Sequence, residues 1–277
     1  MANRTWHGAT DGDYATAGNW LEGSVPTNGD NVRIPATSTR AIVSSLNQSA
    51  VTLGDFIVEE GAPAIGVDSS ATYLQIGLSG AFRFAGAGTA LIDLGSSNIV
   101  AQVDATATPA TGYCGLYLKG SSMSVLAING GYVGLAWRMG ETATATTIRV
   151  NAASCRLWAG SGVTNTTTTV TNGTYCGKHG ITTLNVMGGI AITTHSGAIT
   201  TANSYGGYFY PNSTGTITTL NVLGGIVDFT TCGAARTVTN WKHELGTLKA
   251  DEGYVTLTNR TTPTGANSYV ASRIVTT

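Results

Sequence analysis

The sequence predicts an all-β fold: a parallel β-helix formed by a single chain, with an N-terminal cap. Three observations carry this prediction. The chain contains an internal repeat with a spacing of 18 residues, its composition favours strands and turns, and no segment has a convincing 3.6-residue apolar period. Right-handed coils are preferred. An 18-residue coil also suits a left-handed β-helix, but the hexapeptide signature of that class is absent, and the hand stays open.

The repeat is clearest between residues 181 and 226. The segment ITTLNVMGGI (181–190) recurs as ITTANSYGGY (199–208) and as ITTLNVLGGI (217–226), so the offsets are 199 − 181 = 18 and 217 − 199 = 18. Each copy consists of two short apolar strands joined at a Gly-Gly pair, which supplies the positive φ angles of a turn. Such a unit cannot bury its apolar face alone, but coils stacked about 4.8 Å apart can.

Looser copies extend this pattern through most of the chain and define the expected organisation. Residues 37–260 are expected to form a solenoid of roughly eleven coils, about 50 Å long. Residues 1–36 lack the repeat texture and contain two of the five tryptophans, so they are expected to form the N-terminal cap that closes an exposed apolar end. Residues 261–277 are expected to be a closing segment or tail.

Composition narrows the classes of function. Only 10% of the 277 residues are charged, against about 25% in typical soluble domains, and the net charge is −1. No basic run is present, so neither nucleic acid nor a membrane surface is an expected partner. No run of 18 apolar residues and no signal peptide are recognisable, so synthesis in a cytoplasm is expected.

The N-terminal segment carries a resemblance. TWHGA (5–9) is followed by GNWLEGSVPTNGDNVRI (18–34), a pattern that resembles the cap of β-helical virion proteins of tailed phages and of autotransporter-like bacterial surface proteins. The resemblance implies a β-helical architecture rather than an activity. It implies that five residues pack as a cap over the first coil: Trp6, Trp20, Pro26, Asp30 and Ile34.

Catalysis is not expected. Glycoside hydrolysis normally needs two carboxylates and a calcium site needs several oxygen ligands, yet no Asp or Glu occurs between Glu141 and Asp228. Acids could meet only outside those central coils. His179 and His195, 16 residues apart, are expected to be surface or turn residues. The four cysteines form no C-x-x-C pair and are expected to be mostly buried thiols. No cofactor and no metal are therefore expected.

The register of the three clear repeats predicts two ladders of side chains. If Ile190 points inward, strand alternation turns Ala191, Phe209 and Val227 outward as an apolar row. Such a row indicates a partner interface, or else a surface covered by a neighbouring loop. Asn185, Asn203 and Asn221 share the same spacing and are expected to form a structural amide ladder along the axis.

Together these observations favour a non-enzymatic structural virion protein of a tailed phage, such as a capsid decoration, cement or fibre-like component. Its expected partners are other virion proteins, either the major capsid protein or neighbouring copies in a homo-oligomer such as a trimer. The expected location is the virion, with the cell surface as the alternative. Two other functions stay open: a cell-surface adhesin or glycan-binding β-helix, and a polysaccharide-degrading β-helix enzyme.

Overall fold

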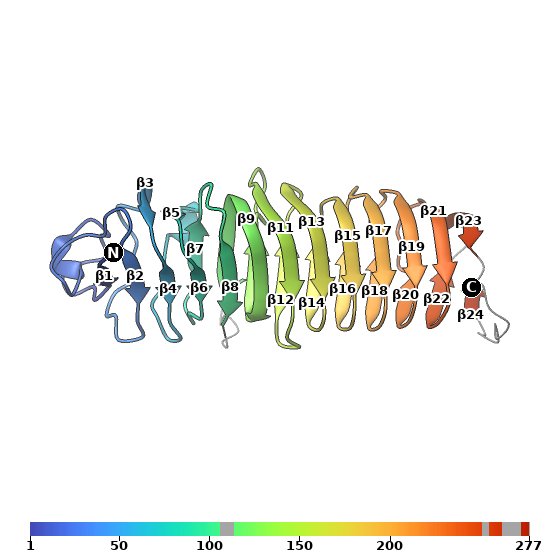
Figure 1. The fold of residues 1–277 in the computed structure, drawn as a ribbon, viewed down its shortest axis with the longest axis horizontal. Helices are drawn as coiled ribbons and strands as arrows, with labels where there is room; N and C mark the ends of the chain where they lie inside the picture. Colours follow the sequence, from blue (N-terminus) through green and yellow to red (C-terminus); the bar gives the residue numbers. More distant parts are fainter. Residues whose placement is uncertain (106–113, 251–254, 262–272, 277) are drawn as a thin grey trace.

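The protein is an elongated parallel β-solenoid, as its repeat predicts (Figure 1). The computed structural model describes residues 1–105, 114–250, 255–261 and 273–276, and about eleven turns are stacked along one axis. The described helices are two short 3-10 turns, η1 (Ala17–Asn19) and η2 (Asp68–Ser70). Neither of them is long or apolar enough to cross a membrane. The all-β prediction is therefore confirmed.

Each regular turn contributes one strand to each of two parallel sheets. The strands of the first sheet, called sheet 1, are β1 (Asn3–Thr5), β2 (Asn31–Ile34), β4 (Phe56–Val58), β6 (Phe82–Phe84), β8 (Val100–Asp104), β9 (Leu116–Gly130), β11 (Ala143–Val150), β13 (Val163–Val170), β15 (Ile181–Val186), β17 (Ile199–Ser204), β19 (Ile217–Val222), β21 (Arg236–His243) and β23 (Val255–Thr261).

The second sheet, called sheet 2, follows the same order along the axis. Its strands are β3 (Asn47–Leu53), β5 (Leu74–Leu78), β7 (Ala90–Asp93), the N-terminal part of β9, β10 (Tyr132–Leu135), β12 (Arg156–Ala159), β14 (Thr174–Gly177), β16 (Ile190–Thr193), β18 (Tyr208–Pro211), β20 (Ile226–Asp228), β22 (Thr247–Ala250) and β24 (Arg273–Thr276). The long strand β9 pairs in both sheets, so it joins them within one turn.

The core lies between the two sheets and is formed by the alternate, inward-facing residues of each strand. In the repeat, Leu184, Ala202 and Leu220 are register partners in sheet 1, and each is almost completely buried. Identical spacing therefore stacks similar side chains on one another. This stacking buries the apolar surface that no single coil can bury.

Glycine forms the corner between the two sheets in the regular turns. Gly189, Gly207 and Gly225 have φ angles of 63°, 64° and 68°, in the left-handed region that suits glycine. A Cβ atom on Gly207 would lie 2.4 Å from the carbonyl oxygen of Gly189 in the turn before. Both the backbone conformation and the close stacking of the turns therefore require glycine at this corner.

The segments at both ends of the chain contribute strands to the sheets. Strand β1 pairs with β2 and β2 pairs with β4, so residues 1–36 supply the first rungs of sheet 1 as well as a cap. At the other end, β24 pairs with β22, so residues 273–276 continue sheet 2. The rest of the predicted closing segment or tail, residues 262–272 and 277, lies outside the described residues.

Candidate functional site

The cap closes the N-terminal end with stacked aromatic rings. Trp6 and Trp20 are buried and meet edge to face, with ring centroids 5.2 Å apart, and Tyr14 packs against Trp20 at 5.0 Å. Each indole N–H has a partner, because Trp6 donates to the carbonyl of Arg40 and Trp20 donates to the carbonyl of Tyr14, both at 2.9 Å. The rings therefore cover the first turns without leaving an indole donor unpaired.

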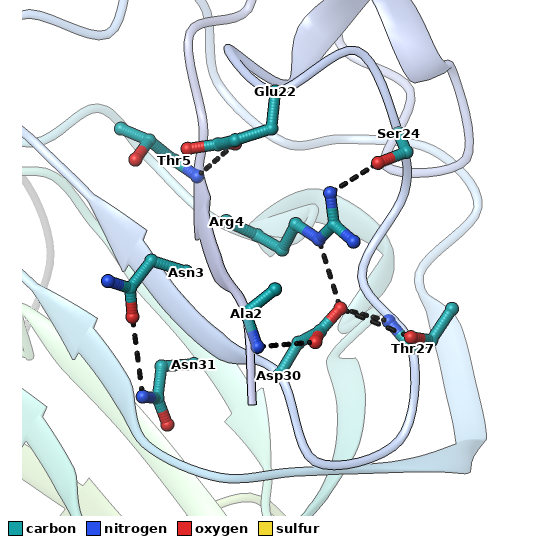
Figure 2. Close-up of polar contacts among 9 residues, drawn as sticks. All are labelled: Ala2, Asn3, Arg4, Thr5, Glu22, Ser24, Thr27, Asp30 and Asn31. Atoms are coloured by element: carbon teal, nitrogen blue, oxygen red, sulfur yellow. Dashed lines mark hydrogen bonds and ion pairs between the residues drawn. The ribbon is translucent and has the colours of Figure 1, made fainter.

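Asp30 holds the two edges of the cap together (Figure 2). Its carboxylate accepts hydrogen bonds from the Arg4 guanidinium at 3.0 Å, the Ala2 amide at 3.1 Å, and both the amide and the hydroxyl of Thr27 at 3.1 Å. Burial alone would raise the pKa of this carboxyl, but the bonds from Arg4, Thr27 and Ala2 outweigh burial and lower the pKa to about 2. Asp30 is therefore ionised and structural.

The remaining predicted cap residues, Pro26 and Ile34, are also buried. Figure 2 shows that Glu22 and Ser24 add further contacts to this region, since Glu22 accepts from the amide of Thr5 at 2.8 Å and Arg4 donates to the hydroxyl of Ser24. All five predicted residues thus lie in the closed terminal layers. They stabilise the end of the rod.

The predicted amide ladder is present on the outer side of sheet 1. The side-chain amide of Asn203 donates to the side-chain oxygen of Asn185 at 2.9 Å, and Asn221 donates to Asn203 at 2.8 Å. Partly exposed threonines surround the ladder, as at Thr183, Thr201 and Thr219. Sheet 1 therefore presents a polar face, which needs no partner to cover it.

The predicted interface row is wrong, because its residues face the core instead of the solvent. Ala191, Phe209 and Val227 are 0%, 1% and 0% exposed, so they point into the core and not outward. Inward and outward residues alternate within the strand, as predicted. The left-handed glycine before each strand, however, determines which of its residues points inward first. The alternation of one strand therefore cannot be extended across the corner to the next strand, because the corner residues do not alternate.

The outward positions of sheet 2 are nevertheless apolar. Ile190, Tyr208 and Ile226 form one row of register partners, and Ile192 and Tyr210 form the next. Tyr208 is 44% exposed and the other four are half-buried. The rings of Tyr208 and Tyr210 lie nearly parallel, 6.1 Å apart. These five residues, called the apolar strip, are a larger outward apolar surface than the predicted row.

Toward the N-terminus, a charged cluster replaces the strip on the same side of the rod. The Tyr73 hydroxyl donates to Glu141 at 2.6 Å, and Lys119 lies 4.4 Å from the Tyr73 ring centroid and 3.5 Å from Asp93. Arg138 pairs with Asp68 and lies over the Tyr117 ring at 4.4 Å. Burial, and then the bond to Glu141, raise the pKa of Tyr73 well above its usual value, so its hydroxyl stays a donor.

Sequence reasoning missed this charged cluster. It anticipated only that acids could meet outside the central coils; Asp68, Asp93 and Glu141 belong to one cluster there, but each contacts a different partner. Each carboxylate already has a partner within the cluster: Arg138 for Asp68, Lys119 for Asp93 and Tyr73 for Glu141. Three neighbouring hollows of about 410, 370 and 320 Å³ lie beside them: the first and second share Lys119, the first and third share Gln75, and the second and third share Asp93 as lining residues.

Between the charged cluster and the apolar strip lies a third group, called the aromatic–cation patch: Tyr132, Trp137, Arg156, Trp158 and Lys178. Tyr132 and Trp158 meet edge to face at 5.6 Å, and the Arg156 guanidinium lies 5.1 Å from the Tyr132 ring centroid. The Lys178 ammonium lies 3.9 Å from the Trp137 ring centroid. The three rings are half-buried, so each keeps accessible area.

The histidines do not form a joint site. His195 is exposed in a turn, as expected, whereas His179 is 4% exposed and bonds through Nε2 to the side-chain oxygen of Asn165 at 3.0 Å. Burial lowers the pKa of His179 to about 4, so this ring is neutral. His179 lies in the bend that follows β14, yet it is buried rather than at the surface, and His243 is buried too.

The cysteines are free thiols, three buried and Cys176 half-buried, as expected. Burial raises the pKa of the Cys114 thiol to about 12, so it is unreactive at neutral pH. Within the described ranges, no three of His, Cys, Asp and Glu gather as they would around a metal ion.

Comparison of the chain with protein families, curated proteins and solved structures finds no match. The assignment of a solenoid therefore depends on the structure itself, and the resemblance of the N-terminal segment to virion and surface β-helices stays a prediction.

Proposed function

We propose that the protein is a non-enzymatic structural component of a phage virion, a decoration, cement or fibre-like rod, which docks through the apolar strip. The observation that carries this proposal is the difference between its two faces. Sheet 1 turns threonines and an asparagine ladder outward, whereas sheet 2 turns Ile190, Tyr208 and Ile226 outward in register. Contiguous exposed apolar surface of this kind marks contact sites.

The proposed occupant of the strip is a virion protein, first of all a neighbouring copy of the same chain. Two long, flat sheet faces of equal pitch can pack along their whole length, because the turns repeat at the same spacing in both copies. Large outward side chains such as Tyr208 and Tyr210 supply apolar area at a small cost in side-chain entropy. The N-terminal resemblance supports the virion as the place of assembly.

A pair of matched double variants tests the docking step. Tyr208→Ser with Ile226→Ser removes apolar area from the strip. Tyr205→Ser with Met187→Ser removes side chains of similar exposure, 46% and 50% against 44% for Tyr208, from a Gly-Gly corner outside the strip. We expect the wild type and the corner variant to sediment as oligomers in analytical ultracentrifugation, and the strip variant to sediment as a monomer.

The virion assignment needs its own measurement. An antibody raised against the purified chain is applied to density-gradient fractions of a lysate from producing cells. The proposal expects the antigen in the particle fractions, and labelling of particles by immuno-electron microscopy. A wild-type chain that is monomeric at all concentrations and absent from particle fractions would contradict the proposal.

A further inference from the structure

The central turns have an unusual charge distribution. Residues 142–227 contain Arg149, Arg156 and Lys178 but no Asp or Glu. Two of these cations belong to the aromatic–cation patch on sheet 2, and the third is exposed on the outer side of sheet 1. Among the described residues, no carboxylate forms an ion pair with Arg156 or Lys178. Their charges are therefore open to an external anion.

One ring of the patch, Trp158, lies between these two cations, while Tyr132 is opposite Arg156 and Trp137 lies beside Lys178. Strand β12 pairs with β14 so that Arg156 is opposite Thr174 and Trp158 is opposite Cys176. Lys178 follows the end of β14, four residues beyond Thr174. Along the strand direction the backbones of Arg156 and Lys178 are thus about 13 Å apart, at about 3.3 Å per residue. Trp158 lies between them, so an elongated ligand can meet a cation, a ring and a second cation in sequence.

We propose that the aromatic–cation patch binds an acidic polysaccharide, a function beyond docking through the apolar strip. The faces of pyranose rings carry C–H groups that pack against an aromatic ring such as Trp158. Uronate carboxylates match the planar guanidinium of Arg156, which can donate two parallel hydrogen bonds, and the ammonium of Lys178. The patch is open on the flat side of the rod, which suits a polymer that extends past both ends of the site.

Charge decides between this ligand and nucleic acid. Aromatic rings with cations also suit single-stranded nucleic acid, but such binding requires neutralising a phosphate at every nucleotide along the groove. The patch offers two cations in a chain of net charge −1. That supply is too small for such a groove. In a uronate polymer the C–H faces of the sugar rings contact the aromatic rings, so two cations suffice to bind two of its carboxylates.

The test uses the full chain with four polymers: alginate, its neutral propylene glycol ester, oligo(dT) and polyglutamate. We expect the wild type to bind alginate, with affinity that falls as salt rises. The ester should bind at least about tenfold more weakly, since it cannot form the charge-assisted hydrogen bonds, each worth roughly a factor of ten. Oligo(dT) should also bind at least about tenfold more weakly because the patch has too few cations for it, and polyglutamate because it has no sugar ring to pack on Trp158. Arg156→Gln and Lys178→Gln should each weaken alginate binding about tenfold by the same reasoning. Arg149→Gln, the same change on sheet 1, should leave it unaltered.

The aromatic contribution has a separate pair of variants. Trp158→Leu keeps apolar contact with the residues beneath but removes the ring, whereas Trp158→Phe keeps a ring; circular dichroism verifies that both fold. We expect the Leu variant to lose alginate binding and the Phe variant to retain most of it. Three results would overturn the proposal: no alginate binding at low salt, equal loss in Arg149→Gln and Arg156→Gln, or tighter binding of oligo(dT) or polyglutamate than of alginate. None of them bears on self-association through the apolar strip.

Discussion

At the scale of single residues, the repeat stacks identical side chains in a column along the axis. Asn203 donates to Asn185 and accepts from Asn221, so its amide bridges three successive turns. The spacing of 18 residues made this ladder predictable, because equal coil lengths put identical residues in register. An amide also has both a donor and an acceptor, so a column of asparagines can bond in one direction without a mismatch.

The ladder yields a graded stability prediction. Asn203→Ala leaves Asn185 without its donor and Asn221 without its acceptor, so we expect a loss of about 1–2 kcal/mol in the free energy of unfolding. Asn185→Ala breaks only one of these bonds and should cost about half as much. Urea unfolding, monitored by circular dichroism, compares the two. Equal losses in both variants would contradict the ladder, because stability would then not depend on the number of amide hydrogen bonds that are broken.

The corner glycines yield a second prediction at this scale. Gly207→Ala puts a residue with a Cβ atom at a left-handed φ and brings that Cβ against the backbone of the preceding turn. We therefore expect a loss of about 3 kcal/mol in the free energy of unfolding. Gly233 is the matched control, because a Cβ there meets nothing within 4 Å and its φ is not positive. If Gly233→Ala lowers the urea midpoint as much as Gly207→Ala, corner geometry is not what requires glycine.

At the scale of elements, the sequence was informative wherever coil length is constant. It predicted the two strands of each repeat, but it gave the wrong outward face for Ala191, Phe209 and Val227, because a left-handed corner resets strand phase. In the N-terminal half the coil length varies: Leu74 pairs with Ile92, an offset of 92 − 74 = 18, and Ile92 pairs with Leu118, an offset of 118 − 92 = 26. Without a constant offset, the contact between Tyr73 and Glu141 could not be predicted.

The cap gives a pH-dependent prediction for one element. Because the native pKa of Asp30 is about 2, below its ordinary value of 3.8, its stabilising contribution is present above about pH 4 and is lost as the pH falls through about 2. Asp30→Asn removes the ion pair with Arg4. We expect a lower urea midpoint than the wild type at pH 7, and a gap that narrows between pH 4 and pH 2. A gap that stays constant with pH would mean that Asp30 is not the group that titrates.

At the scale of the whole molecule, two faces of one rod have different chemistry. Sheet 1 is polar along the clear repeats, and sheet 2 passes from a charged cluster through the aromatic–cation patch to the apolar strip. The sequence predicted the rod, since the constant repeat determines how its coils stack. It could not predict this division, because which residues face outward depends on the corners and on irregular coil lengths.

The central claim is that the apolar strip is buried in the assembled protein. A cryo-EM reconstruction of the native assembly tests it most directly, since the two faces of so elongated a rod are distinguishable even at modest resolution. We predict density packed against the outer side of β16, β18 and β20, with the asparagine face of sheet 1 open to solvent. A reconstruction in which sheet 1 is covered and the outer side of those three strands faces solvent would contradict the account.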